Sequence, residues 1–117
     1  MPIIDIEIVA PSVDPKMAQP LANELGHAFK AAPGKVWVRV RALPPELYAE
    51  NHDPSPPAPV FVTILAGHPP EGEALHRRVA FVTEAVARVT GRDPRHVHVL
   101  FESAARGRLA FGGELVK

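Results

Sequence analysis

The sequence contains no cysteine. This absence excludes disulfide bonds, thiolate chemistry and cysteine zinc sites, and it leaves the redox compartment open. The chain also lacks any apolar segment approaching ~18 residues, the length that a membrane-spanning helix needs. Its amino terminus has no basic region followed by an apolar core. We therefore expect a soluble, cytoplasmic protein that does not interact with a membrane.

An excess of charge of either sign is missing too. The 13 basic and 13 acidic side chains cancel, and no block of like charge occurs. We expect no nucleic acid partner, because such a partner requires a strongly basic surface. The 117 residues suit one compact domain. A lone subunit of this size buries only about two-thirds of its unfolded surface, so association with further copies would stabilise it.

Two stretches of the first half alternate between apolar and polar side chains. Residues 3–9 alternate isoleucine with acidic residues, and residues 36–41 alternate valine with Trp37, Arg39 and Arg41. A period of two predicts a strand with the two kinds of side chain on opposite faces.

A helix is predicted between these strands. Asp14 can accept from the free N–H groups of a first turn, and Pro15 suits the first helical position. Apolar side chains then recur every three or four residues as far as Phe29. Because Pro20 costs about 3 kcal/mol in a helix interior, the regular helix should begin around 16–19, with the proline in its first turn.

The second half repeats this order after a proline-rich linker, 44–58. The continuous apolar run 60–65 predicts a buried strand, and residues 75–89 have the apolar spacing of an amphipathic helix. A further strand is expected at 97–101. Residues 104–113 are punctuated by glycine and predict a hairpin or tail.

The chain is thus a degenerate tandem repeat, in which residues 36–40 correspond to residues 97–101. We predict an α+β fold with two βαβ units, about 1–43 and 59–117. Together they form a four-stranded sheet with both helices on one face. The uncovered face carries a mixture of charged and apolar side chains, which suits a subunit interface enclosing charged sites.

Pro2 offers the most direct acid–base chemistry in the sequence. Proline normally permits removal of Met1, which would leave a secondary amine at the start of the first strand. An α-amino group titrates near pH ~7.7–8.0, and apolar surroundings or nearby cations lower its pKa, so Pro2 is a candidate general base. The alternative is structural, since proline can begin an edge strand without needing a donor.

Three parts of the sequence together resemble the tautomerase superfamily. They are Met1–Ile4 with the strand that follows, residues 97–102 running on to Gly107, and the tail 111–115 with its Gly-Gly-Glu-Leu. The whole chain resembles a fused pair of 4-oxalocrotonate tautomerase units. Residues 93–97 are also similar to the lead-in to the last long strand in the macrophage migration inhibitory factor branch.

The resemblance implies a keto–enol tautomerase without a cofactor, in which Pro2 is the catalytic base. It further implies a homotrimer and a small carboxylate substrate, an unsaturated 2-oxo or 2-hydroxy acid. Pro59 lies near the matching position of the second unit, but its nitrogen is an amide and cannot act as a base. We expect one active site per chain.

The substrate-binding arginines of the family are not retained at the matching positions. One arginine, after the first strand, corresponds to Ser12 in the first unit and His68 in the second. The other, at the start of the later strand, corresponds to Trp37 and His98. The carboxylate must therefore be bound by other residues.

Arg39 and Arg41 share a strand face with Trp37 and are candidates to bind that carboxylate. Their alternative role is a solvated face or interface ion pairs. Tyr48 matches roughly the family's apolar or aromatic wall and is either that wall or a packing residue. Arg108 is a further candidate, either as a surface group or by reaching a neighbouring subunit's site.

His98 is a candidate proton donor or wall of the substrate site, or else a packed interfacial histidine. His96 and His98 can share a face, but no third ligand is evident, so we expect no metal.

Three functions remain open at this point. The first is the tautomerase. The second is a related hydratase, dehalogenase or decarboxylase that uses protonated Pro2; it ranks lower because the turn 66–68 lacks the paired arginines of that branch. The third is a non-enzymatic binding protein with a vestigial site.

Overall fold

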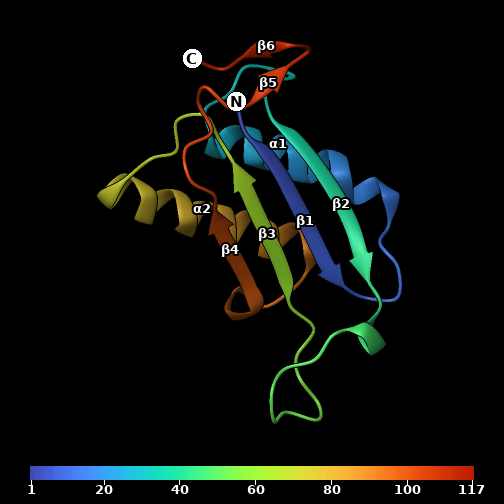
Figure 1. Ribbon diagram of the computed structural model, residues 1–117. Coiled ribbons are helices and arrows are strands. Elements are labelled where there is room, and N and C mark those ends of the chain that lie inside the picture. Colours follow the sequence, from blue (N-terminus) through green and yellow to red (C-terminus); the bar gives the residue numbers. More distant parts are fainter.

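A computed structural model of the chain describes residues 1–117 and consists of one sheet, two helices and a small hairpin (Figure 1). Both helices lie behind the sheet in this view, and no helix has the length and apolarity to cross a membrane. The main elements are β1 (Ile3–Val9), α1 (Ala18–Ala28), β2 (Trp37–Leu43), β3 (Val60–Leu65), α2 (Gly72–Thr90) and β4 (Val97–Phe101).

The four strands lie in the order β2-β1-β3-β4. β1 and β2 are parallel, as are β3 and β4, whereas the central strands β1 and β3 are antiparallel. Each half of the chain is therefore one βαβ unit, and the units meet along their first strands. This arrangement confirms the predicted α+β fold.

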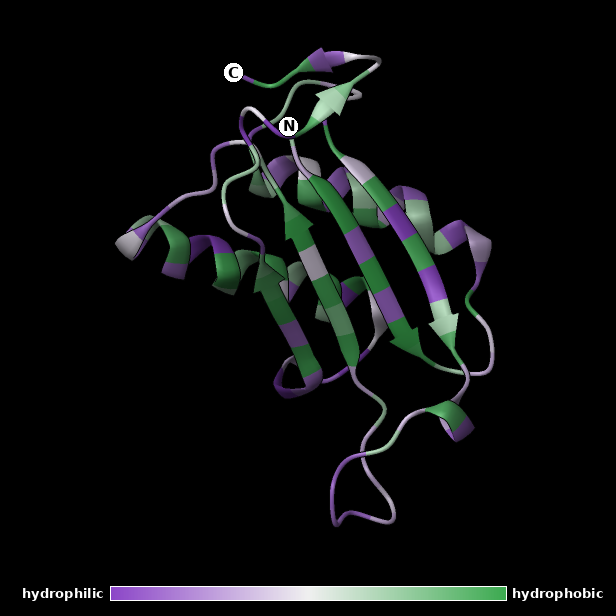
Figure 2. Cartoon of the chain, viewed as in Figure 1, coloured by the Kyte–Doolittle hydropathy of each residue, from purple (hydrophilic) through white to green (hydrophobic).

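The hydrophobic core lies between the sheet and the helices. Ile4, Ile6 and Ile8 of β1 are buried on that face, and Leu21, Leu25, Val82 and Val86 of the helices pack over them. Figure 2 shows the alternation of apolar and polar residues along β1 and β2 that produces the two faces. The opposite face of the sheet has no helix over it, and we call it the open face.

The helices begin and end close to their sequence signals. The carboxylate of Asp14 accepts from the Lys16 N–H (2.9 Å) at the start of a short 3-10 turn, and α1 begins at Ala18 with Pro20 in its first turn. α2 ends at Thr90 and is capped by Gly91, which has a φ of 73° and donates its N–H to the Ala87 carbonyl. Glycine adopts this left-handed conformation without the steric cost of a side chain.

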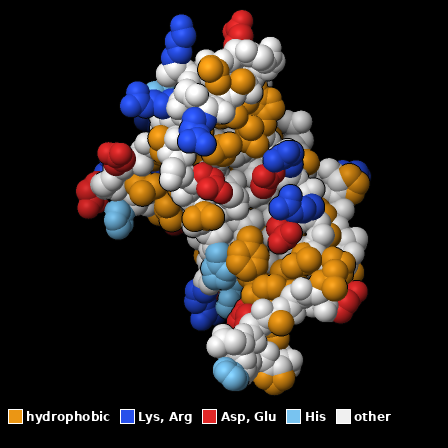
Figure 3. All heavy atoms as spheres, in the orientation of Figure 1, with side chains coloured by type: hydrophobic (Ala, Val, Ile, Leu, Met, Phe, Trp, Pro, Cys, Tyr) orange, Lys and Arg blue, Asp and Glu red, His pale blue; other side chains and the backbone are white.

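Two ion pairs lie across β1 and β2 on the open face. Arg39 donates to both carboxylate oxygens of Asp5 (2.6 and 2.8 Å), and Arg41 donates to Glu7 (3.1 Å). The parallel register places each arginine directly beside its acid. Figure 3 shows these charges among apolar side chains.

The predicted hairpin lies further along the chain than residues 104–113. Its strands are β5 (Ala110–Phe111) and β6 (Glu114–Leu115), because Gly112 and Gly113 both have positive φ, 59° and 89°, and form the tight turn. The ring of Phe111 stacks on Trp37 with centroids 4.3 Å apart. This contact anchors the hairpin over the end of the sheet where the chain begins.

Candidate functional site

Pro2 lines a cavity of about 510 Å³ at the end of the sheet where β1 starts. Its walls combine apolar groups with basic side chains, a mixture typical of small-molecule sites. The lining residues are Met1, Pro2, Phe29, Ala31, Ala32, Lys35, Ala66, Gly67, His68, Arg78 and Val116.

The sheet register brings distant parts of the chain to Pro2. The Pro2 carbonyl accepts from the Trp37 N–H (3.1 Å), so Lys35 comes to the cavity just before β2. β3 runs antiparallel to β1 and ends with Leu65 beside Ile3, which brings the following loop to the cavity. The site is therefore built from both βαβ units.

Three basic side chains line the cavity, Lys35, His68 and Arg78, and no carboxylate does. The guanidinium carbon of Arg78 lies 4.6 Å from the centroid of the Phe29 ring. Such a cation–π contact holds the side chain in place without neutralising its charge. The cavity is suited to an anion.

Met1 lies at the mouth of this cavity. Its side chain is 51% exposed, whereas Pro2 beneath it is fully buried. While Met1 is attached, the Pro2 nitrogen is an amide without basicity. Removal of Met1 would create a basic secondary amine and open the cavity above it at the same time.

The C-terminal segment forms the remaining wall of the Pro2 cavity. Val116 lines it and packs directly on Gly67, where a Cβ atom would lie only 2.6 Å from the Val116 Cγ1 atom. The His68 Nε2 atom lies 2.6 Å from the Lys117 carbonyl oxygen, the partner to which it can donate.

The arginines favoured by the sequence lie elsewhere. Neither Arg39 nor Arg41 lines the Pro2 cavity. Arg39 is held by Asp5, and its guanidinium is the main cause that lowers the pKa of that carboxyl. Within one chain, these arginines balance the acids of β1.

Tyr48 and His98 come together, but not with Pro2. Both rings contact Phe61, with centroid separations of 6.0 and 5.4 Å. Phe61 lies beside Glu7, five residues along β1 from Pro2, a distance of roughly 17 Å. The Tyr48 hydroxyl donates to Glu50 (2.6 Å), and this hydrogen bond raises the pKa of Tyr48 to about 12.

Arg108 lines a separate hollow of about 320 Å³ with Leu65 and Glu102. No group of three or more His, Asp or Glu side chains is arranged to hold a metal, and His96 and His98 have no third partner.

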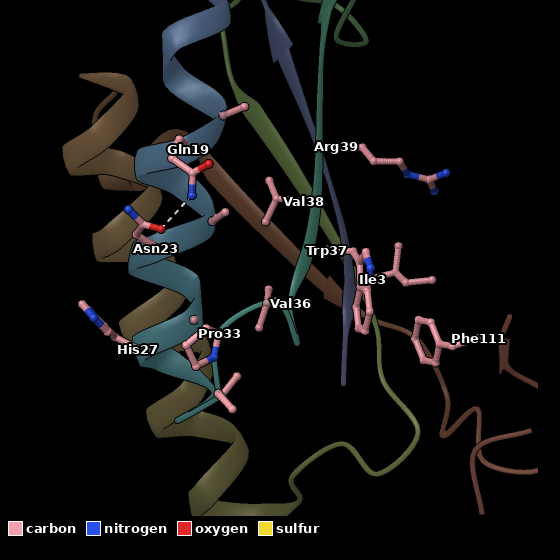
Figure 4. Close-up of a pocket in the computed structure, with 16 residues that line it drawn as sticks. Ile3, Gln19, Asn23, His27, Pro33, Val36, Trp37, Val38, Arg39 and Phe111 are labelled. Carbon is pink, nitrogen blue, oxygen red and sulfur yellow. Dashed lines mark hydrogen bonds between the residues drawn. The ribbon is translucent and has the colours of Figure 1, made fainter. Parts of the chain in front are cut away.

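A larger hollow, about 850 Å³, lies along the exposed edge of β2 rather than at Pro2. Figure 4 shows Gln19, Asn23 and His27 of α1 on one side of β2, and Trp37 and Phe111 on the other. It is a groove around a free strand edge, where backbone groups can pair with another chain.

Lys35 and Arg78 were missed by the sequence reasoning. Arg78 stands beside the apolar stripe of α2, where a charge is ordinarily solvated, and Lys35 follows Gly34 in a turn. The only available signal was topological, since Lys35 directly precedes the strand that pairs with β1, and Arg78 lies in the helix that follows β3.

Comparisons with known proteins identify the fold. No family model and no curated protein matches the sequence. Solved structures do match. A native fused 4-OT has 14% sequence identity to this chain and a TM-score of 0.77. The match covers 97% of this chain and 94% of the 4-OT chain. A macrophage migration inhibitory factor homologue from Prochlorococcus marinus is 13% identical, with a TM-score of 0.76. The match covers 98% of this chain and 99% of the homologue.

The FG41 malonate semialdehyde decarboxylase inhibited by 3-bromopropiolate is similar too, at 17% identity and a TM-score of 0.72, with 94% and 88% covered. The chain thus has the tautomerase superfamily fold, as its sequence resemblance implies. Because a fused 4-OT, a decarboxylase and a macrophage migration inhibitory factor homologue share this fold, the fold does not select a reaction.

Proposed function

We propose that the protein is a keto–enol tautomerase acting on a small unsaturated 2-oxo or 2-hydroxy acid, with Pro2 as general base once Met1 is removed. One observation carries the proposal. Pro2 lines a cavity with Lys35, His68 and Arg78 and without any carboxylate side chain. Such surroundings favour the neutral form of an amine and attract an anionic substrate.

The chemistry is a proton transfer within the substrate. The Pro2 nitrogen accepts the hydroxyl proton of an enol, leaving a conjugated anion and a protonated amine. The amine then returns the proton to a carbon of the same conjugated system, which gives the keto form and regenerates the neutral base. No proton is gained or lost overall.

Lys35 and Arg78 bind the substrate carboxylate in this proposal and stabilise the negative charge that develops on the conjugated oxygen. Phe29, Ala31 and Ala66 supply the apolar surface around the carbon chain. The lining of this cavity does not include Arg39, Arg41, Tyr48, His98 or Arg108, so a role for any of them would require contact with the Pro2 cavity of a neighbouring copy.

We propose a homotrimer as the assembly. The open face presents Leu100, which is 58% exposed, and Trp37 and Phe61 beside neutralised ion pairs. The free edge of β2 offers unpaired backbone groups as well. Burial of these surfaces would stabilise a chain of this size. Light scattering after size exclusion tests this directly, and a mass of one chain would contradict it.

The activity is tested with phenylenolpyruvate and 2-hydroxymuconate. Pro2→Ala should lower kcat/KM by about 10²–10⁴-fold, the usual contribution of a positioned base. Pro59→Ala is the matched control, because the Pro59 nitrogen is a buried amide and should not affect turnover. If wild type and Pro2→Ala turn over both substrates equally, the Pro2 mechanism is wrong.

The superfamily alternatives give a different result in the same assay. A hydratase, dehalogenase or decarboxylase would not convert either enol. It would still react with a 3-halopropiolate, either by turning the reagent over or by becoming modified at Pro2. A binding protein with a vestigial site would do neither.

A further inference from the structure

The C-terminal segment, residues 109–117, contributes Val116 to one side of the Pro2 cavity, and backbone hydrogen bonds within the hairpin hold Val116 in place. The Val116 N–H donates to the Leu109 carbonyl (2.8 Å), and the Val116 carbonyl accepts from the Gly107 N–H (2.6 Å). These two hydrogen bonds involve the Val116 backbone and fix the position of the residue. Its side chain is thereby directed at Gly67 and the cavity.

Gly67 permits this contact because it has no side chain. Its backbone is not in the left-handed region, so no turn requires glycine there. The close approach of Val116 supplies a reason instead, since any Cβ atom would collide with Val116 Cγ1 at 2.6 Å. Gly67 is buried, so the group that a side chain at this position would meet is protein and not solvent.

His68 holds the end of the segment. It is an exposed side chain whose Nε2 atom lies 2.6 Å from the Lys117 carbonyl oxygen. Because His68 immediately follows Gly67, one short loop both receives Val116 and binds the next residue along the tail.

We infer that Val116 is a specificity-determining residue that limits the size of the molecule reaching Pro2, and that His68 is the positioning residue that keeps it there. The inference rests on the proposed function, which makes the Pro2 cavity a reaction site. It assigns the C-terminal segment the role of a wall whose bulk selects small, unbranched carboxylates.

Two reagents with a small and a large group on the same alkyne test the size limit, and comparison of each variant with wild type cancels the difference in their intrinsic reactivity. 2-Oxo-3-pentynoate carries a methyl group on its alkyne, and 2-oxo-4-phenyl-3-butynoate carries a phenyl group at the same position. Each can add the Pro2 amine across its triple bond, so intact mass follows the rate of modification. The quantity compared is the ratio of the phenyl rate to the methyl rate.

Val116→Ala should raise this ratio by roughly tenfold or more, the discrimination that small changes in an apolar pocket produce. Val116→Ile should lower it. Gly67→Ala should raise it as well, because the added methyl group displaces Val116. The methyl rate of each variant serves as the internal reference for that variant, so the ratio cancels any general change in the reactivity of Pro2.

A pair of His68 variants separates positioning from general loss of structure. His68→Leu removes the donor and should raise the ratio by roughly two- to tenfold, the effect of one hydrogen bond on an equilibrium. His68→Gln can still donate to the Lys117 carbonyl and should retain the wild-type ratio.

Hydrogen exchange of the Val116 and Gly107 amides gives a second readout that needs no reactive Pro2. Exchange should accelerate in His68→Leu and Gly67→Ala and remain at the wild-type rate in His68→Gln. If no variant is modified by either reagent, the proposed function fails and the size limit fails with it; the positioning of Val116 by His68 is then tested by this order of exchange rates alone. Folded variants with an unchanged reagent ratio, or equal exchange in all of them, would overturn it.

Discussion

Replacement of Arg78 by methionine separates the cations of the Pro2 cavity from those of the open face. Methionine keeps an unbranched, polarisable side chain against Phe29 and removes the charge and the N–H donors of the guanidinium. Arg39→Met is the matched variant, because it deletes a guanidinium that is held by Asp5 and does not line the cavity.

The expected loss follows from the contact that Arg78 would make. A hydrogen bond to a charged group contributes about 1.5–3 kcal/mol, so Arg78→Met should lower kcat/KM by roughly 10- to 150-fold. Much of the loss should appear as a higher KM, since the carboxylate is bound in both the ground and transition states. The lost cation–π contact should reduce the free energy of unfolding by only about 0.5–1 kcal/mol.

The assay is steady-state turnover of phenylenolpyruvate, with urea denaturation of each variant to confirm that it is folded. Arg78→Lys should recover part of the loss, because it restores the charge without the planar fork. If Arg39→Met abolishes turnover while Arg78→Met leaves it intact, the assignment is refuted. The carboxylate would then be bound by the open face of a neighbouring subunit.

Three further predictions concern the fold around the site. Ile6→Ala should lower the free energy of unfolding by about 2–5 kcal/mol in urea, because Ile6 is fully buried. Tyr48 is the chain's only tyrosine, so its tyrosinate absorbance should titrate at about 12 and move toward 10.0 in Glu50→Gln. Because Arg39 lowers the pKa of Asp5, wild type should be more stable than Asp5→Asn at any pH above the ordinary pKa of 3.8. In acid titrations monitored by circular dichroism, this advantage should vanish as the pH falls through the lowered pKa of Asp5. An advantage that persists at lower pH would contradict the pairing.

Periodicity predicted β1, β2 and the helices because one face of each element packs against the core. β3 was predicted as a buried strand from its continuous apolar run, but only alternate residues of it are buried. The isoleucines of β1 repeat every two residues, and the structure buries them as expected. Asp14 and Gly91 mark helix ends through local hydrogen bonding and backbone conformation, which depend on few neighbours. The hairpin was shifted because its turn depends on two adjacent glycines near the end of a glycine-rich stretch.

The candidate site was less predictable because it is assembled from chain ends. Pro2 was found from its own chemistry, but Lys35 and Arg78 reach the cavity only through the strand register and the path of α2. Arg39 and Arg41 were attractive because they share a face with each other. The sequence does not reveal that the same register supplies each with an acid from β1.

The most direct test of the central claim is the intact mass of the protein before and after treatment with 3-bromopropiolate, with the modified residue mapped by peptide sequencing. Our account predicts that Met1 is absent and that a single adduct forms on the Pro2 nitrogen. A chain that retains Met1, or one that lacks it and remains unmodified at Pro2, would contradict the claim that Pro2 is the base.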